Sequence, residues 1–407
     1  MRVLVLTNLF PPDVLGGYEV LAQDLAGALR ARGNVVDVLT TGDGTVRDGV
    51  SRTLRLSRRF GSPARADRAR HVVVAAQNRS ATLSHLENQG RPDVALVMSM
   101  RRLGLAPLRV LQNQGIPYVV TVNDDWPVAY ARPPSRKNFA LLRDLIDRQV
   151  MAFHSWKGIR VRNVIYLSQA VRDYVKEQGV CFPAGVVLPQ GVDIDAFSPR
   201  PYRPISSKPT LLFVGRLHPS KAPDVAIDTV ACLRRQGVDA RLVIAGVADD
   251  PTYLAGLRAS ALRLGVSDHV QWMGMLDRTS LPDLYRTSDV VLFASKLQHE
   301  GQGLTWLEAM ACGVPVVASP SGGAREFLDR HPVARRVESC TGECFAEAII
   351  DLADRPERQR ALVTAALEVA RRHGTLEQYV SAVQAQLHAA ARGDAVLFPA
   401  SAVQSRA

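Results

Sequence analysis

The stretch that decides the fold is HEGQGLTWLEAMACGVPVVA, residues 299–318. Residues 304–312 are mostly strong helix formers, and Gly313 followed by Pro315 supplies a helix stop. Residues 314–318 then form a short run rich in β-branched side chains, which is typical of a strand buried on both faces of a parallel sheet. The stretch therefore predicts a loop, a helix and a buried strand in that order.

The loop before this helix carries the candidate chemistry. Gly301 and Gly303 suit a tight turn where backbone approaches a ligand closely. Free N–H groups at a helix N-terminus favour anions such as a diphosphate. Glu300 and Glu308 frame the loop, and since a carboxylate can accept two hydroxyl hydrogen bonds, one acid could hold a sugar and the other a ribose. Spacing alone leaves an ordinary strand-loop-helix with surface acids equally open.

The pattern Glu300-Gly301-x-Gly303-Leu304-x3-Glu308-Ala309-Met310-Ala311-x-Gly313-x-Pro315-Val316-Val317-Ala318 resembles the Glu-x7-Glu signature of family-four retaining glycosyltransferases. A dozen positions agree in order. The resemblance implies the α/β fold called GT-B, in which two Rossmann-like domains with doubly wound parallel sheets face each other across a cleft and a C-terminal helix crosses back to the first domain.

Length and composition agree with such a protein. A chain of 407 residues, 47% apolar and 22% charged, is long enough for two ordinary globular domains. No window is apolar enough to span a bilayer, and the opening residues 1–8 are too short for a signal peptide, so a cytoplasmic location is expected. Five cysteines without zinc-type spacing predict neither a disulfide framework nor a metal site.

The formal charge is +11, and seven arginines lie between Arg52 and Arg70. A basic surface attracts nucleic acid, anionic membrane or a phosphorylated substrate. We favour ordinary solvated faces and expect no nucleic-acid partner, because no recognised nucleic-acid-binding motif accompanies the charge. Peripheral membrane contact through the basic first half stays open.

Strands alternate with helices along both halves, which indicates parallel, doubly wound sheets. The expected strands are 3–7, 35–39, 93–98, 118–122, 163–167, 211–214, 240–245, 270–273, 289–294 and 314–318. The expected helices are 17–32, 70–88, 103–115, 139–154, 168 onward with Ser168 as N-cap, 225–236, 281–287, 304–312, and helical segments from 343 with breaks at Pro356 and Gly374. We expect an acceptor-side domain at 1–200, a donor domain at 201–375, a returning helix at 376–392 and a disordered tail at 393–407.

Ligands bind such sheets beyond the C-terminal ends of the strands. The Gly16-Gly17 turn opens the first helix, and in the family resembled this turn approaches the donor phosphates or the acceptor. Asn123-Asp124 follows another strand, at the place where the family usually has His-Asp, and both are candidates for acceptor contact. Asn123 cannot carry a positive charge, so any histidine-dependent role is in doubt.

In the second half, Gly215-Arg216-Leu217-His218-Pro219-Ser220-Lys221-Ala222 resembles the family's "GRL…KG" loop, with Ala222 where glycine is usual. Arg216 and Lys221 would place cations at the departing diphosphate and so replace a metal. Backbone near Gly246 would approach the nucleotide base. A passage resembling the family's "PNGVD" lies at 189–193, with Gln190 in place of asparagine.

The resemblance implies transfer of a hexosyl group from a nucleotide-diphosphate sugar to a hydroxyl acceptor, with retained anomeric configuration and without metal or cofactor. Glu308 would hold the ribose. Glu300, with backbone N–H groups of Gly301, Gln302, Gly303 and Leu304, would hold the sugar and the distal phosphate. UDP is the favoured nucleotide, while GDP and ADP stay open, as do the acceptor and the oligomeric state.

Two alternatives remain from the sequence. One is a sugar phosphorylase or nucleotide-sugar epimerase on a similar scaffold. The other is a basic adaptor for nucleic acid or membrane that performs no chemistry. The adaptor leaves the paired acids and the Arg216–Lys221 loop unexplained.

Overall fold

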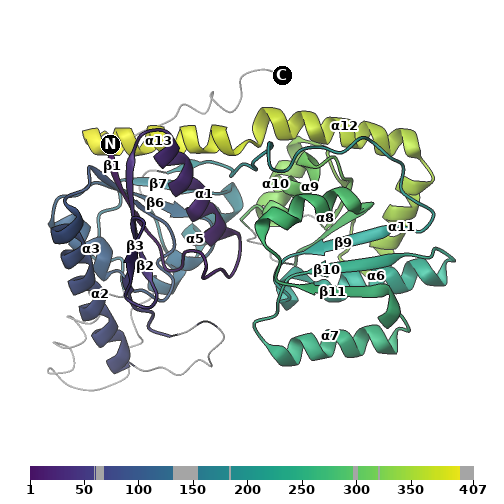
Figure 1. Cartoon of the computed structure of the whole chain (residues 1–407), viewed down its shortest axis with the longest axis horizontal. Coiled ribbons are helices and arrows are strands. Elements are labelled where there is room, and N and C mark those ends of the chain that lie inside the picture. Colours follow the sequence, from purple (N-terminus) through teal and green to yellow (C-terminus); the bar gives the residue numbers. More distant parts are fainter. Residues whose placement is uncertain are drawn as a thin grey trace. The chain divides into compact units, whose positions relative to one another are not determined.

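The computed structural model describes residues 1–58, 60, 68–131, 155–182, 185–296, 301–319 and 321–394. The chain forms two compact units, one of Met1–Leu188 with Val380–Ala407 and the other of Pro189–Tyr379. Each unit is built on its own mainly parallel sheet (Figure 1). The predicted helix at 139–154 and the tail after residue 394 lie outside the described residues.

The first unit contains an eight-stranded sheet in the order β3-β4-β2-β1-β5-β6-β7-β8. Every pairing is parallel except that of β3 with β4. Its strands are β1 (Arg2–Leu6), β2 (Val35–Thr41), β3 (Val46–Arg47), β4 (Val50–Leu54), β5 (Val94–Val97), β6 (Tyr118–Val122), β7 (Asn163–Tyr166) and β8 (Val186–Val187). Its helices are α1 (Gly17–Ala31), α2 (Arg68–Gln89), α3 (Ala106–Asn113), η1 (Trp126–Tyr130) and α5 (Gln169–Glu177).

The second unit contains a six-stranded parallel sheet in the order β11-β10-β9-β12-β13-β14. Its strands are β9 (Thr210–Val214), β10 (Arg241–Ala245), β11 (Val270–Gly274), β12 (Val290–Ala294), β13 (Val316–Ser319) and β14 (Arg335–Arg336). Its helices are η2 (Pro219–Lys221), α6 (Pro223–Arg235), α7 (Pro251–Arg263), η3 (Ser267–His269), η4 (Arg278–Ser280), α8 (Leu281–Thr287), α9 (Leu304–Ala311), α10 (Gly322–Arg330), α11 (Gly342–Ala353) and α12 (Pro356–His373).

The period-two alternation of a strand explains why this second sheet is covered on both faces. In β12, Val290 and Leu292 belong to the core that includes α6 and α11, whereas Val291 and Phe293 belong to the core that includes α9 and α12. Because all four side chains are buried, the strand is a continuous apolar run, as parallel sheets require.

Helix α13 (Leu376–Arg392) begins in the second unit, and its residues from Val380 onward belong to the first. Val380, Val383 and Leu387 are fully buried. The side chain of Arg32, just after α1, donates hydrogen bonds of 2.9 Å to Gln384 and 2.8 Å to Ser381. This last helix is therefore a structural part of the first unit.

The structure moves the expected domain boundary. Residues 189–200 belong to the second unit, whereas the sequence placed the boundary at 200/201. The backbone N–H of Arg200 donates to Cys312 O at 3.1 Å, and Phe197 packs edge-on against Tyr285 at 6.0 Å between ring centres. Because Phe197 and Arg200 are bound to the second unit in this way, the chain leaves the first unit before residue 189.

Candidate active site

In the second unit, strand order reverses between β9 and β12, which is where doubly wound sheets bind ligands. The loop after β9 contains Arg216 and Lys221, and the loop after β12 leads to Gly301. The two loops are joined, because the backbone N–H of Lys296 donates to Ser220 O at 2.8 Å. The sheet topology therefore brings together the residues that the sequence assigned to phosphate chemistry.

Glycines line the carboxyl ends of β9 and β10. Gly215 and Gly246 have φ angles of 147° and 152°. A Cβ on Gly246 would lie 1.8 Å from the carbonyl oxygen of Gly215, so no larger residue fits there. The backbones of the two loops are thus in direct contact, a close approach that only glycine permits.

The loop after β9 presents two cations. Arg216 is half-exposed and lies 3.8 Å from the Asp249 carboxylate, an exposed ion pair that adds little stability. Lys221 ends the short helix η2. The following Ala222 is buried with φ 49° and ψ 50°, a left-handed conformation that usually calls for glycine. The chain thus keeps the turn expected of a glycine while carrying a methyl group.

The loop before α9 presents backbone rather than side chains. Gly303 has φ 81° and no capping side chain, so first-turn N–H groups of α9 are left for a ligand or water. Gly301 and Gln302 are buried. Glu300, predicted to hold the sugar, lies outside the described residues.

Glu308 is held inside the second unit by two donors. The hydroxyl of Tyr285 donates to Oε2 at 2.8 Å, and Arg278 donates to Oε1 at 3.1 Å (the Glu308 side chain is 3% exposed). Burial and the neighbouring carboxylate raise the pKa of Tyr285 well above its ordinary value, which keeps the phenol a donor. A carboxylate oxygen can accept more than one hydrogen bond, so an acid at this position is chemically able to accept from the hydroxyls of a diol.

In the glycine turn before α1, a carboxylate of the chain itself binds two backbone N–H groups. Gly16 precedes α1 and Gly17 begins it. The Glu19 carboxylate accepts from the N–H of Gly16 at 2.9 Å and of Leu15 at 3.3 Å. Burial raises the pKa of Glu19. A carboxylate on these amides disfavours a phosphate there and suits a ligand that brings hydroxyl donors.

Asn123 and Asp124 follow β6 in the same unit. Within the described part of the chain, the carboxamide of Asn123 is buried and neither its nitrogen nor its oxygen has a hydrogen-bond partner. Asp124 accepts from the backbone N–H of Trp126 at 2.8 Å and pairs with Arg101 at 3.2 Å. A buried amide without partners is uncommon, and it marks a place where a ligand or water completes the bonding.

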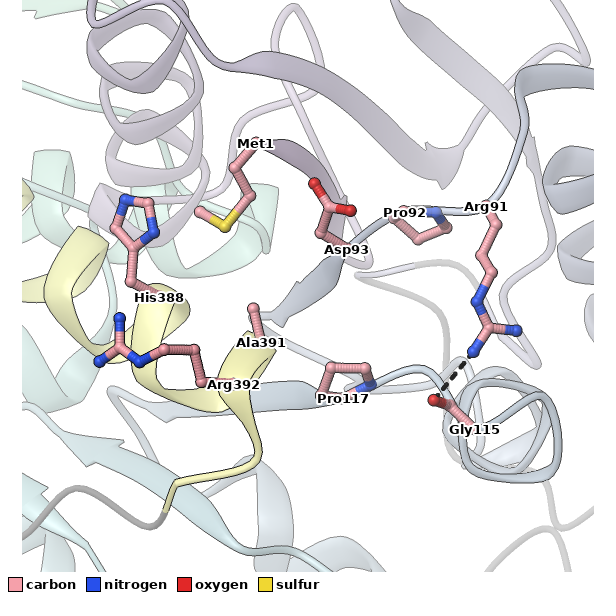
Figure 2. Close-up of a pocket in the computed structure, with 9 residues that line it drawn as sticks. All are labelled: Met1, Arg91, Pro92, Asp93, Gly115, Pro117, His388, Ala391 and Arg392. Carbon is pink, nitrogen blue, oxygen red and sulfur yellow. Dashed lines mark hydrogen bonds between the residues drawn. The ribbon is translucent and has the colours of Figure 1, made fainter.

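A separate cavity of about 660 Å³ lies in the first unit at the amino ends of the strands (Figure 2). Met1, Asp93 and Pro117, which precede β1, β5 and β6, line it together with the end of α13. Arg91 donates to Gly115 O at 3.0 Å at its rim. None of the predicted site residues lines this cavity, because those residues follow the carboxyl ends.

Sequence reasoning missed Arg278, Tyr285, Glu19 and Arg101. Tyr285 follows Leu281 and Leu284 in an amphipathic pattern, so it gave only a core signal. Glu19 stands three residues after Gly16, at the position whose side chain reaches back to the N-cap N–H, and this spacing could have identified it. Arg278 begins the short helix η4 and Arg101 lies in a turn, and no local pattern distinguishes them from the many other arginines.

The described ranges contain neither a metal-binding cluster nor a membrane-spanning helix. No group of three or more His, Cys, Asp or Glu side chains in these ranges could hold a metal ion. No helix in them has the length and apolar character needed to cross a bilayer.

Two family models match consecutive parts of the chain. The model described as Glycosyltransferase Family 4 matches residues 15–196, and that described as Glycosyl transferases group 1 matches residues 195–369. A GDP-mannose-dependent alpha-(1-6)-phosphatidylinositol monomannoside mannosyltransferase of Mycolicibacterium smegmatis is 34% identical over 205 residues, 47% of this chain and 52% of the relative. A D-inositol 3-phosphate glycosyltransferase of Segniliparus rotundus is 33% identical over 226 residues, 54% of this chain and 49% of the relative.

The matches therefore span about half the length of these curated relatives. Solved structures agree on the fold over nearly the whole chain. Anabaena Alr3699/HepE in complex with UDP and glucose gives a TM-score of 0.70 at 19% identity, covering 96% of this chain and 100% of that one. The lipopolysaccharide glycosyltransferase WaaG gives 0.67 at 18% identity, covering 95% and 99%. With its two parallel-sheet units and these matches, the chain belongs to glycosyltransferase family 4 and has the GT-B fold.

Proposed function

We propose that this chain transfers a hexosyl group from a nucleotide-diphosphate sugar to a hydroxyl acceptor with retained anomeric configuration. The observation that supports this most is the grouping at the switch point of the second sheet. A buried carboxylate, Glu308, lies on the first turns of an uncapped helix, and the loop that carries Arg216 and Lys221 is bound through Ser220 O to the N–H of Lys296, in the connection after β12. A nucleotide diphosphate needs this combination of a diol acceptor, free N–H groups and cations.

Each group has a role in the proposal. Glu308 accepts from the ribose hydroxyls, and the N–H groups of Gly303 and Leu304 receive the distal phosphate. Arg216 and Lys221 stabilise the negative charge that builds on the leaving diphosphate as the bond to the sugar breaks. Glu300 holds the sugar hydroxyls. The leaving phosphate takes the proton of the acceptor hydroxyl on the face from which it departs, so the configuration is retained.

The donor nucleotide is proposed to be UDP or GDP. The name of the M. smegmatis relative specifies GDP-mannose, and the HepE structures contain UDP, UDP with glucose, or UDP-glucose. Gly246 and Gly274, with φ angles of 152° and 67°, offer backbone rather than side chains beside the base, and the N–H of Gly246 donates to Gly274 O at 2.8 Å.

The acceptor is proposed to be a phosphorylated polyol, free or carried on a lipid. The relatives named above act on phosphatidylinositol monomannoside or on inositol 3-phosphate. In the first unit, Asn123 and the Glu19 carboxylate provide groups for hydroxyls, and exposed Arg70 with Val72 and Val73 on α2 would suit a lipid-linked acceptor at an anionic surface.

The test is a product analysis. UDP-glucose and GDP-mannose are each incubated with inositol 3-phosphate or with phosphatidylinositol vesicles, and the product linkage is read from the anomeric proton by NMR. We expect an α-linked product from one α-linked donor, formed only when acceptor is present. An inverted product, release of a sugar phosphate, or epimerised donor would contradict the proposal. Vesicle binding that no nucleotide sugar alters, without any transfer, would favour the adaptor.

A further inference from the structure

Gln302 lies in the loop predicted to hold the donor, yet its side chain is buried and turned to another part of the second unit. The backbone N–H of Gln190 donates to Gln302 Oε1 at 2.8 Å, and Gln302 Nε2 donates to Gln190 O at 3.3 Å. Because a peptide N–H can only donate and a carbonyl can only accept, these partners fix the orientation of the amide. Gln302 is 2% exposed.

The rest of the loop is held from its other side. The main-chain oxygen of Gln302 accepts from the indole N–H of Trp306, a buried residue of α9, at 2.6 Å. Next along, a Cβ on Gly303 would lie 2.8 Å from the ring of Phe293 in β12. The backbone that offers its N–H groups to a phosphate is therefore fixed between the α9 side and the peptide of Gln190.

Gln190 lies where the chain passes from one unit to the other, since the units divide between residues 188 and 189. The residues after Gln190 are hydrogen-bonded to residues 374–376, which precede the point where the chain returns to the first unit. The N–H of Val192 donates to Gly374 O at 2.7 Å, and the N–H of Leu376 donates to Val192 O at 2.9 Å. Gly191 packs so closely that a Cβ would lie 2.1 Å from Thr375 O. The second passage follows between residues 379 and 380.

We propose that Gln302 is a positioning residue. Its carboxamide binds both the N–H and the carbonyl of the Gln190 peptide, a contact that we call the clamp. The clamp couples the donor loop to the two segments near which the chain passes between the units, residues 190–192 and 374–376. The proposal rests on the proposed function, because it requires a nucleotide at the loop. Both bonds form only while the loop and residues 190–192 keep one relative position. A ligand that orders the N–H groups of Gly303 and Leu304 thereby orders the peptide of Gln190, and through it residues 374–376.

The substitution Gln302→Met removes both bonds while keeping the side-chain length. Its matched control is Gln359→Met, in the same unit. Gln359 is 1% exposed, its Oε1 accepts from the N–H of Ile205 at 3.1 Å, and its Nε2 donates to Arg203 O at 3.2 Å. The two glutamines thus bind backbone groups in the same way, but of the two only Gln302 is part of the donor loop.

Hydrogen–deuterium exchange is measured on the full chain with UDP and with GDP, each added alone at saturation. In the unaltered protein, we expect one nucleotide to slow exchange at peptides covering 186–196 as well as at the loops containing Lys221 and Leu304. In Gln302→Met, protection at 186–196 should disappear while protection at the Lys221 loop remains. Nucleotide affinity should fall about tenfold, because less of the protein holds the competent loop. Gln359→Met should keep both.

The results separate the clamp from the proposed function. Nucleotide protection at the Lys221 loop without protection at 186–196 in the unaltered protein would overturn the clamp alone. So would retained protection at 186–196 in Gln302→Met, or its loss in Gln359→Met. No protection of the second unit by either nucleotide would overturn the proposed donor site and the clamp with it. The unaltered chain decides the matter even where a variant fails to fold.

Discussion

At the residue scale, the carboxylate of Glu308 shows how one side chain serves stability and binding together. It is buried between the Tyr285 hydroxyl and the Arg278 guanidinium, which satisfy one lone pair on each oxygen. The guanidinium also lies over the ring of Phe197, 5.3 Å from its centre. A substitution at Glu308 would therefore remove the proposed ribose contact and would deprive the buried Tyr285 hydroxyl and the partly exposed Arg278 guanidinium of this acceptor.

We predict that Glu308→Ala weakens nucleotide binding by about 10- to 100-fold, because charge-assisted hydrogen bonds each contribute about 1.5–3 kcal/mol. The same change should lower the free energy of unfolding by about 1–3 kcal/mol, the cost of the unsatisfied donors. Tyr285→Phe is the control, since it removes one donor and keeps the acid. Calorimetric titration with UDP and GDP checks the prediction, and unaltered affinity in Glu308→Ala would refute it.

For Asn123 we predict that one substitution affects folding stability and activity differently. Its amide is buried and has no partner among the described residues, so replacing it with an apolar side chain breaks no hydrogen bond within them. Asn123→Leu should leave the free energy of unfolding unchanged or raise it by about 1 kcal/mol. Sugar transfer should fall at least about tenfold as an acceptor or donor contact is lost. Urea denaturation and initial rates test this, and a loss of stability with full activity would show that Asn123 is only structural.

Glu19 makes stability depend on pH. Burial raises its pKa in the folded protein above the ordinary value near 4.5, so the folded state binds a proton more tightly than the unfolded chain. The resulting loss of folding stability is absent well below pH 4.5, grows as pH rises from about 4.5 to the folded pKa, and is constant above it. Glu19→Gln should therefore have a higher Tm than the unaltered protein at pH 7, and the two should converge near pH 4. The exposed substitution Glu177→Gln controls for the exchange itself.

At the element scale, strand ends rather than strands build the site. In the second sheet, Gly215 directly follows β9 and Gly246 directly follows the neighbouring β10, and this allows the two loops to touch through their backbones. The helix α9 begins at Leu304 because Gly303 takes a left-handed φ of 81° that ends the preceding loop. The predicted helix at 304–312 is confirmed to within one residue.

We predict that Gly246→Ala lowers the free energy of unfolding of the second unit by about 3 kcal/mol or more, since a methyl group 1.8 Å from Gly215 O forces the loops apart. Nucleotide binding should be lost with it. Gly256→Ala, in the middle of α7 with nothing within 4 Å of the new Cβ, should instead stabilise by about 0.5–1 kcal/mol. Denaturation midpoints of the two variants decide; equal midpoints would contradict the close contact.

At the scale of the whole molecule, positive charge is available to a substrate that carries a diphosphate. The formal charge is +11, and Arg216 and Lys221 lie at the edge of the second sheet where the site is expected. We predict that excess EDTA leaves the transfer rate unchanged, because these side chains supply the charge that a metal would otherwise supply. Complete loss of activity with EDTA, recovered by Mg²⁺, would contradict this.

Lys221→Ala should lower kcat about 100-fold with a small change in KM.

Local signals predicted much of the fold. Ser168 caps α5 by accepting from the N–H of Val171 at 3.2 Å, as its position before an amphipathic run predicted. The strands of both sheets other than β3, β4, β8 and β14 were predicted as short apolar runs, because parallel strands are buried on both faces. The short antiparallel pair β3 and β4 was missed, since exposed Val46 and Arg47 give no periodic pattern.

The sequence by itself determined the family, the alternation of strands and helices, and the loops that carry the candidate chemistry, because each depends on residues close together in the chain. The tertiary structure alone decided which side chains meet. Arg278 reaches Glu308 across 30 residues, and Gln302 reaches the Gln190 peptide across 112. Such contacts have no local signature, since they depend on the order of strands in the sheet, and that order also placed residues 189–200 in the second unit.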